Sequence, residues 1–342
     1  MTLSLEQLRR CAVAVDLGAA RTRIYLKRVG LIVDEPTVAA VNTRTGGLIA
    51  VGSFAERMTG RTPGHIMVVR PVSGGAVVDI AMAQRMLRQF VGDKVRRAWR
   101  RKPLLRAAVC TPHDANPLAQ RAAVETLTGL GAKRVELVDT LVAAAVGCGL
   151  PVERPEATMI MVCGATTTQV AVLSLGAIVA AEKVPVGGDT VDHAVVQHLR
   201  NEHELMLASQ AVRPLHLVMS GGAGTAEAPE VHGRDVATGL ARSVRVNPDG
   251  VRAAMHTPLT AITDSIGAVL RRCPPDLVAD LADRGIMLAG GSALLPGLDS
   301  ILRRATGMPV QVAEQPDVCA VMGLGAMLDG NVQPFDLGPL AT

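Results

Sequence analysis

Two segments of the sequence share one pattern, VAVDLGAARTRIYL at residues 13–26 and IMVCGATTTQVAVL at residues 160–173. Each has an apolar run, a short turn of small residues and a second apolar run, the pattern of a β-hairpin with a tight turn. With Asp16 opposite Val162, the alignment pairs Gly18 with Gly164, Ala19 with Ala165 and Thr22 with Thr168. A match this short also arises by chance. Taken as a repeat, it predicts two related halves, each opening with strand, turn and strand.

Length and composition agree with two globular domains. The chain has 342 residues, of which 49% are hydrophobic and 19% charged, which is typical of folded rather than disordered proteins. A net charge of +4 is too small to require a nucleic-acid partner. The six cysteines are far apart and form no CxxC pair, so we expect reduced thiols in a cytosol rather than disulfides or a metal site.

Helical and strand patterns alternate along the chain. The segment 286–302, IMLAGGSALLPGLDSIL, predicts a strand that passes through two glycines directly to a helix N-terminus. The segment 111–132 indicates a loop, a helix and a glycine stop, with a strand after it. The segment 187–203 predicts a helix with Asp189 as its N-cap. This alternation favours an α/β protein whose sheets are covered on both sides.

One uncharged run, residues 157–181, is long enough to cross a membrane by length alone. Its centre, GATTTQ, is polar and forms turns, so two short strands around a tight loop explain the run better. The N-terminal MTLSLEQLRR lacks the long apolar core of a signal peptide. We therefore expect a protein without a membrane-spanning segment.

The glycine turns have the form of phosphate-binding loops. A nucleoside triphosphate needs close-approaching backbone N–H groups, and carboxylates that position Mg²⁺ and the attacking water. The first turn, DLGAART, offers Asp16 together with Gly18. The second turn, around Gly164, has no acidic residue. It therefore predicts a phosphate-binding turn without the carboxylate that would position the metal ion.

Several motifs together resemble the bacterial actin family of MreB and Mbl. They are, in order, DLGAARTRIYLK, DEPTVAAV, RTPGHIMVVRPVSGGAVVD, AAAVGCGLPV, VGGDTVD, RCPPDL and GIMLAGGSALLPGLDSIL. The resemblance extends from about Val13 to Gly330 and is weakest from about 204 to 250. It implies the actin-like α/β fold of two domains, each with a smaller subdomain and with a nucleotide between them. It also implies filaments that lie under the membrane and organise cell shape and wall synthesis.

The resemblance further implies domain limits. The first domain would comprise residues 1–139 with 313–342, including a small subdomain at about 30–75. The second would comprise residues 140–312, including a small subdomain at about 182–250.

The same resemblance places the glycine loops around the nucleotide. The residues implied to contact it are Asp16, Gly18, Ala19, Ala20, Gly164, Ala165, Thr166, Gly187, Gly188, Asp189, Gly290, Gly291 and Ser292. Asp16 is the one that could also hold a metal ion through water. For Asp16 the alternative interpretation is a simple turn cap. Asp189 is expected to cap its helix in either case.

The chain departs from the family pattern at the nucleotide. The metal-managing Asp of the family's second loop, DIGGGTTE, is here Val162, and the second Glu of EEPMAAA is Thr140. The Glu and Lys of AERIKH, which line the nucleoside pocket, fall on Val212 and Leu215, and Ser292 replaces a glycine. Water-orienting groups contribute typically about 10²–10⁴-fold to rate, so hydrolysis should be negligible.

We therefore expect the binding of ATP with Mg²⁺ to be weakened or lost. An apolar residue where a hydrated ion would lie disfavours the ion. The alternative is that Asp16 and Asp139 together still hold Mg-ATP and hydrolyse it slowly, as in an active filament ATPase.

A basic segment at residues 92–110, GDKVRRAWRRKPLLRAAVC, contains Trp99 followed by Leu104 and Leu105. For a generic protein this is a solvated helix end before a buried strand. In MreB-like proteins the loop at this place inserts an apolar pair into the membrane, and arginines around apolar residues suit an anionic leaflet. Nucleic acid is not expected, because a lone tryptophan makes a poor stacking platform.

The leading hypothesis is a structural, MreB-like cytoskeletal protein. It would form filaments with itself or with a paralogue at the inner face of the cytoplasmic membrane, beside membrane proteins of wall synthesis. The sugar kinases and heat-shock ATPases of the same superfamily are disfavoured, because no substrate-binding domain follows the last nucleotide loop.

Overall fold

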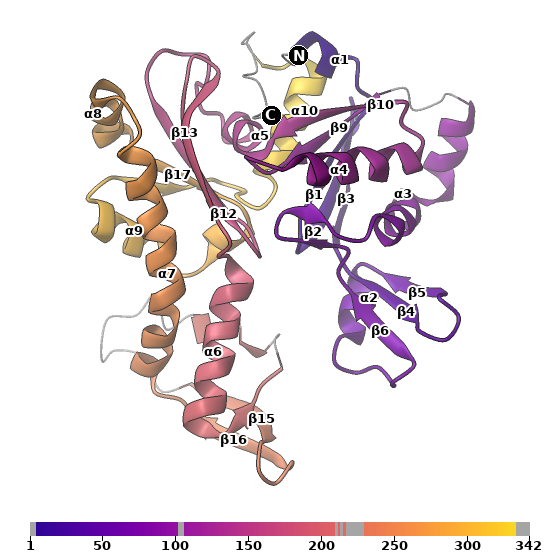
Figure 1. Ribbon diagram of the computed structural model, residues 1–342, viewed down its shortest axis with the longest axis vertical. Coiled ribbons are helices and arrows are strands. Elements are labelled where there is room, and N and C mark those ends of the chain that lie inside the picture. Colours follow the sequence, from indigo (N-terminus) through magenta and orange to yellow (C-terminus); the bar gives the residue numbers. More distant parts are fainter. Residues whose placement is uncertain (1–4, 102–105, 209–210, 213–214, 217–228, 333–342) are drawn as a thin grey trace.

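The fold is built around two five-stranded sheets, as seen in a computed structural model that describes residues 5–101, 106–208, 211–212, 215–216 and 229–332 (Figure 1). The first sheet has the order β10-β9-β1-β2-β3. Its strands are β1 (Val13–Leu17), β2 (Arg21–Leu26), β3 (Gly30–Pro36), β9 (Arg106–Thr111) and β10 (Arg134–Asp139). The second has the order β13-β12-β11-β17-β18. Its strands are β11 (Thr158–Cys163), β12 (Thr168–Ser174), β13 (Ala177–Val184), β17 (Ile286–Ala289) and β18 (Val310–Val312). We call the parts around these sheets the first and second lobes.

The two sheets have the same topology. In the first, β1, β2 and β3 are antiparallel neighbours, and β9 and β10 extend the sheet in parallel from β1. In the second, β11, β12 and β13 are antiparallel, and β17 and β18 extend the sheet in parallel from β11. The prediction of two related halves is therefore confirmed.

The two predicted hairpins correspond residue by residue. Asp16 pairs with Arg23 across β1 and β2, and Val162 pairs with Gln169 across β11 and β12. The turns close with equivalent backbone hydrogen bonds, from Gly18 N to the residue 21 carbonyl at 3.1 Å and from Gly164 N to the residue 167 carbonyl at 2.9 Å. The run 157–181 thus contains strands, and within the described residues no helix is long and apolar enough to cross a membrane.

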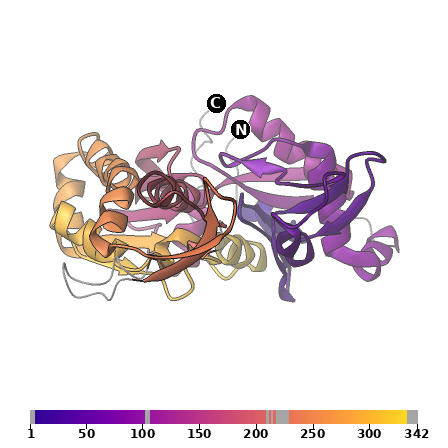
Figure 2. The same cartoon turned by 90° about the horizontal axis from the view of Figure 1, so that it is seen from below.

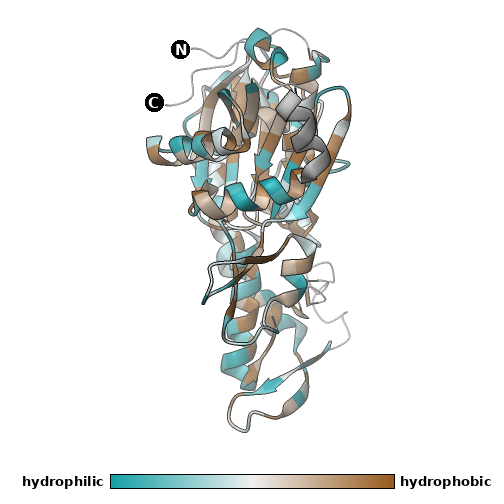
Figure 3. Ribbon diagram, turned by 90° about the vertical axis from the view of Figure 1, so that its right-hand side faces the viewer, coloured by the Kyte–Doolittle hydropathy of each residue, from teal (hydrophilic) through white to brown (hydrophobic). Residues whose placement is uncertain are grey.

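Helices cover the faces of both sheets. Those of the first lobe are α3 (Ile80–Arg101) and α4 (Pro117–Leu130), whose left-handed C-cap is the predicted Gly131. Those of the second lobe are α6 (Gly188–His203), α7 (Pro248–Leu270), α8 (Pro275–Arg284) and α9 (Leu298–Thr306). Apolar and polar residues alternate around the helices of the first lobe, as expected for helices that bury one face on a sheet (Figure 3).

A small sheet extends from each lobe. In the first lobe, β5-β4-β6 consists of β4 (Ala39–Asn42), β5 (Leu48–Val51) and β6 (Ile66–Val69), with α2 (Ser53–Met58) packed on it. In the second, β14-β15-β16 consists of β14 (Leu205–Met206), β15 (Glu230–Asp235) and β16 (Ala241–Arg245). Both lie at the lower end of the molecule in Figure 1. A two-stranded ribbon, β7 (Val72–Ser73) and β8 (Ala76–Val77), leads into α3.

The lobes are joined by a common apolar core. Each lobe has its own cluster of buried side chains, and a third cluster draws on both sheets, on α1 (Leu5–Arg9), on α5 (Thr140–Gly147) and on α10 (Cys319–Asp329). Helices α5 and α10 touch at backbone distance, because a Cβ at Gly323 would overlap the carbonyl oxygen of Ala143. The lobes lie side by side in the view from below (Figure 2).

Two local predictions were wrong. Asp189 is not the N-cap of α6, because the helix begins at Gly188 and its N-cap is Gly187. No α-helix directly follows the glycines after β17. A single 3₁₀ turn, η3 (Gly291–Leu294), comes first, and α9 begins only at Leu298. The reason is Pro296, which disfavours helical backbone at the residue before it, and Leu295 is extended.

Candidate functional site

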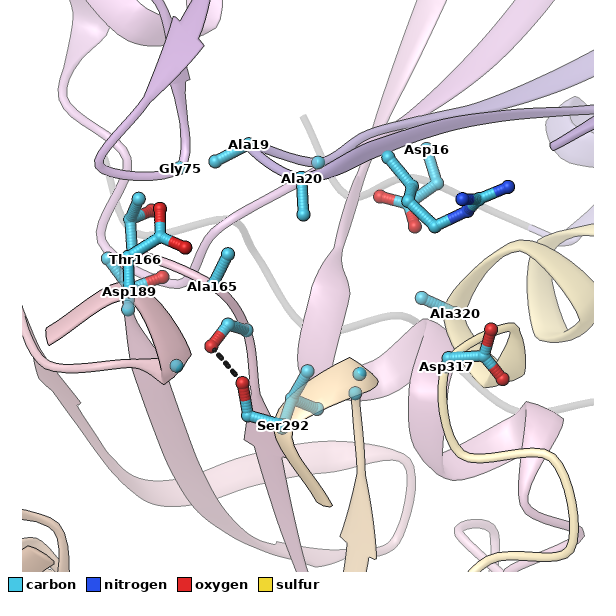
Figure 4. A pocket seen from close by; sticks show the side chains of 18 of the residues that line it. Asp16, Ala19, Ala20, Gly75, Ala165, Thr166, Asp189, Ser292, Asp317 and Ala320 are labelled. Carbon is cyan, nitrogen blue, oxygen red and sulfur yellow. Dashed lines mark hydrogen bonds between the residues drawn. The ribbon is translucent and has the colours of Figure 1, made fainter. Parts of the chain in front are cut away.

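A cleft of about 640 Å³ lies between the lobes. This volume is in the range of small-molecule sites in proteins. The turn after β1 faces the turn after β11 across it, as Ala19 and Ala20 face Ala165 in Figure 4. Of the thirteen residues predicted to contact a nucleotide, twelve line this cleft. The exception is Gly187, which packs beneath the second turn, where a Cβ would come within 2.5 Å of the Gly164 carbonyl oxygen.

The loops of the second lobe are tied to one another by hydrogen bonds. Gly188 N donates to the Gly164 carbonyl at 3.0 Å, and Asp189 N donates to the Ala165 carbonyl at 2.8 Å. The Ser292 hydroxyl donates to the Gly164 carbonyl at 2.8 Å, the bond drawn in Figure 4. Ser292, which departs from the family glycine, therefore anchors the second phosphate-type loop.

The backbone conformation at position 290 requires a glycine. Its φ is +87°, which L side chains rarely adopt, and a Cβ there would overlap the carbonyl oxygen of Cys163. Gly291, next to it, has open space around its Cα and no positive φ. The first of these glycines thus brings β17 against the end of β11, directly below the cleft.

Val162 and Thr140 stand at the two positions where the family pattern has carboxylates. Both line the cleft. Val162 is 8% exposed and belongs to the core cluster shared by the lobes. The Thr140 hydroxyl donates to the Thr111 carbonyl at 2.9 Å. Among the residues that the structure describes, no three His, Cys, Asp or Glu side chains come together as metal ligands.

Both carboxylate oxygens of Asp139 have partners in the structure. One carboxylate oxygen caps α5 by accepting from Leu141 N at 2.8 Å, and the other lies 2.8 Å from His113 Nδ1. Asp139 is not among the residues that line the cleft. The alternative in which Asp16 and Asp139 together hold Mg-ATP stays a prediction, and the structure places Asp139 behind the cleft lining with a partner on each oxygen.

His113 connects the two lobes. Its backbone N donates to Gln169 Oε1 on β12 at 2.7 Å, while its ring contacts Asp139 at the end of β10. The hydrogen bond to Asp139 raises the pKa of His113, and partial burial acts in the opposite direction. Gln169, at the position equivalent to Arg23, thus accepts a hydrogen bond from the first lobe.

Asp16 lies at the cleft beside a buried arginine. Burial raises the pKa of Asp16, the Arg23 guanidinium acts in the opposite direction, and Asp34 adds to the rise. Arg23 Nη2 donates to Asp317 Oδ2 at 2.9 Å, Nε lies 3.1 Å from Asp34 Oδ1, and Nη1 lies 3.9 Å from Asp16 Oδ2. Sequence reasoning missed Arg23. The available signal was a charged residue opposite Asp16 in the strand RTRIYL.

His216 Nε2 lies 2.8 Å from Asp192 Oδ1, and both residues line the cleft. Val212 and Leu215, the two positions expected at the nucleoside, are fully buried in the core of the second lobe and do not line it. The side chain of Trp99, at the end of α3, is not described. Leu104 and Leu105 lie outside the described residues.

Two sheets of identical order, a common core and a cleft with one glycine turn from each lobe define an actin-like protein. MreB5 of Spiroplasma citri, solved bound to AMPPNP, has this structure with a TM-score of 0.84 and 26% identity, over 91% of this chain and 93% of that one. The model of the family described as MreB/Mbl protein matches residues 10–334. The chain belongs to the MreB/Mbl family.

Curated relatives agree with this assignment. The chain is 37% identical to the cell shape-determining protein MreB of Escherichia coli (strain K12) over 323 residues, which are 93% of each protein. It is 34% identical to the cell shape-determining protein Mbl of Bacillus subtilis (strain 168) over 319 residues, 93% of this chain and 95% of Mbl.

Proposed function

We propose that this protein is a structural member of the bacterial actin cytoskeleton. It forms filaments, or joins those of a paralogue, and these organise cell shape and wall synthesis. The nucleotide contacts are the glycine loops that line the cleft, with nucleotide binding weakened and ATP hydrolysis lost. The observation that carries the proposal is the pair Val162 and Thr140, which stand at the cleft where the family pattern has carboxylates.

Two physical arguments support the loss of hydrolysis. Without a carboxylate to orient water, turnover loses about 10²–10⁴-fold. A hydrated divalent cation prefers oxygen ligands, and Val162 presents methyl groups at the cleft while it packs in the shared core. The Thr140 hydroxyl does not replace the missing carboxylate, because it cannot accept a proton as a general base near neutral pH and already donates to Thr111.

The direct test is calorimetric titration of the full chain with Mg-ATP and with a non-hydrolysable analogue. The same titration is made with the double variant Val162→Asp, Thr140→Glu. Weak or absent binding of Mg-ATP by the native chain, with binding recovered in the variant, supports the proposal. Micromolar binding together with phosphate release by the native chain overturns it and favours an active filament ATPase.

The proposed location is the inner face of the cytoplasmic membrane, with membrane proteins of wall synthesis as partners. Trp99, Leu104 and Leu105 would insert, and the arginines around them would contribute about 1 kcal/mol each at an anionic leaflet. Co-sedimentation with anionic and neutral vesicles tests this, using the variant Trp99→Ser, Leu104→Ser, Leu105→Ser. Binding to anionic vesicles that the variant lacks is expected. Retention of DNA in place of vesicles would favour the nucleic-acid alternative.

A further inference from the structure

A buried arginine lies where the cleft would hold a cation. Arg23 is directly opposite Asp16 in the β1–β2 register, is 6% exposed and lines the cleft. A charged side chain is rarely buried to this extent unless it is paired or coordinated. Its position beside Asp16 is therefore a specific feature of the site.

Acidic groups surround Arg23. Its guanidinium contacts Asp317 from the segment before α10, Asp34 from β3 and Asp16 from β1, at 2.9, 3.1 and 3.9 Å. The contact to Asp34 is an ion-pair distance only, because Arg23 Nε is buried and makes no hydrogen bond to the described residues. Asp34 also accepts a hydrogen bond from Arg21 Nε at 2.6 Å. The guanidinium thus supplies positive charge to Asp16, while its Nε–H is buried without an acceptor.

The site does not fit a divalent cation. Mg²⁺ requires about six oxygen ligands at short distance, usually including several waters, and Asp16 is the acidic side chain at the first turn. That carboxylate already faces a fixed positive charge, which repels a second cation. The equivalent position in the second hairpin is Val162, which offers no oxygen ligand.

We propose that Arg23 takes the place of the divalent cation, and that the cleft binds a nucleoside diphosphate in its metal-free form. This inference rests on the proposed nucleotide site between the glycine turns. Without a metal ion, each further phosphate adds negative charge near Asp16 and Asp189, both of which line the cleft. The diphosphate is therefore favoured over the triphosphate. Arg70, whose Nη1 lies 3.5 Å from the Ala19 carbonyl, adds a second positive charge at the first turn.

The test is a fluorescence titration of the full chain with a labelled ADP, in excess EDTA and in excess Mg²⁺, followed by displacement with unlabelled ADP and ATP. We expect the dissociation constant for ADP in EDTA to be within about threefold of that in Mg²⁺, and ATP to bind more weakly than ADP in EDTA. Binding of ADP only in Mg²⁺ overturns the inference. So does the absence of ADP binding under both conditions.

Variants of Arg23 test its role separately. Arg23→Leu should weaken ADP binding in EDTA by at least about tenfold, and Mg²⁺ should then restore binding, because three carboxylates lose their shared cation. Arg23→Lys keeps the charge and should stay independent of Mg²⁺. Arg121→Leu, the same change on the exposed face of α4, is the matched control. An Arg23→Lys protein that needs Mg²⁺, or an Arg23→Leu protein that binds like the native chain, overturns the inference.

The two proposals fail in different ways. ATP turnover by the native chain contradicts the proposed structural function and is read as phosphate release, which this titration does not measure. ADP binding that depends on Mg²⁺, without turnover, contradicts only the role of Arg23.

Discussion

Replacing Val162 by Asp restores the family carboxylate and tests whether the position is now part of the apolar core. Val162 is 8% exposed and packs in the cluster that joins the lobes. Losing a buried Val side chain costs roughly 2 kcal/mol, and desolvating an ionised carboxylate brings the total to about 4 kcal/mol. With an unfolding entropy of about 2.1 cal/mol/K per residue, a chain of 342 residues should melt about 6 °C lower at neutral pH.

The loss of stability in Val162→Asp should depend on pH. A carboxyl at this buried position has a raised pKa, so the folded state keeps its proton where the unfolded state has lost it. Stability of the variant should therefore fall as pH rises from about 4, the ordinary pKa of Asp, through the raised value in the fold. At pH 4 the melting temperature should be only about 3 °C below that of the native chain, from the lost apolar contacts alone.

Thermal unfolding between pH 4 and 8, without nucleotide or metal, measures both effects. Val162→Asn is the matched control, because it loses the same apolar contacts but carries no charge, and its deficit should not change with pH. Equal melting temperatures for Val162→Asp and Val162→Asn across this range would refute the reasoning, because the carboxyl would then ionise in solvent rather than in the apolar core.

Four further variants, one of them a control, test individual contacts by equilibrium unfolding. Gly290→Ala should lower the free energy of unfolding by at least about 2 kcal/mol, because the position has a positive φ and a Cβ would overlap the backbone. Gly291→Ala, the control, should be nearly neutral. Equal losses for the two variants would contradict this. Ser292→Ala should cost about 1 kcal/mol through the lost bond to the second turn, and no loss would mean that this bond is not formed. His113→Gln should lower the free energy of unfolding most at low pH. The raised pKa of His113 in the fold stabilises the protein below about 6.5, the ordinary pKa of His, and this stabilisation disappears as pH rises through the folded pKa. A loss of stability that grows with pH would show that the contact to Asp139 is not charge-assisted.

The hairpins and their relation were predictable from the sequence, because alternating apolar runs around small-residue turns specify local structure. The strands β1, β2, β11 and β12 lie where the repeat placed them. The helix of residues 117–130 was equally predictable from its spacing and its glycine stop. These elements depend on neighbours in the chain, which a single sequence displays directly.

One wrong prediction and two missed contacts concern groups whose partners lie far away in the sequence. Asp189 has the composition of an N-cap, but its backbone N–H is taken by the Ala165 carbonyl. The contact between Asp139 and the ring of His113 joins residues 26 apart, and no pattern in the sequence indicates it. Arg23 was not predicted as a site residue, because its contact with Asp317 joins residues 294 apart. Which polar groups meet is decided by tertiary packing, which spacing does not reveal.

We propose that assembly of this protein does not depend on ATP turnover. The most direct measurement is sedimentation of the purified full chain with Mg-ATP, with Mg-ADP and without nucleotide, with phosphate release followed in the same samples. We predict equal amounts of sedimented polymer in the three conditions, and phosphate release at the level of the protein-free control. Polymer that forms only with Mg-ATP, and phosphate release that rises with the amount of polymer, would contradict the claim.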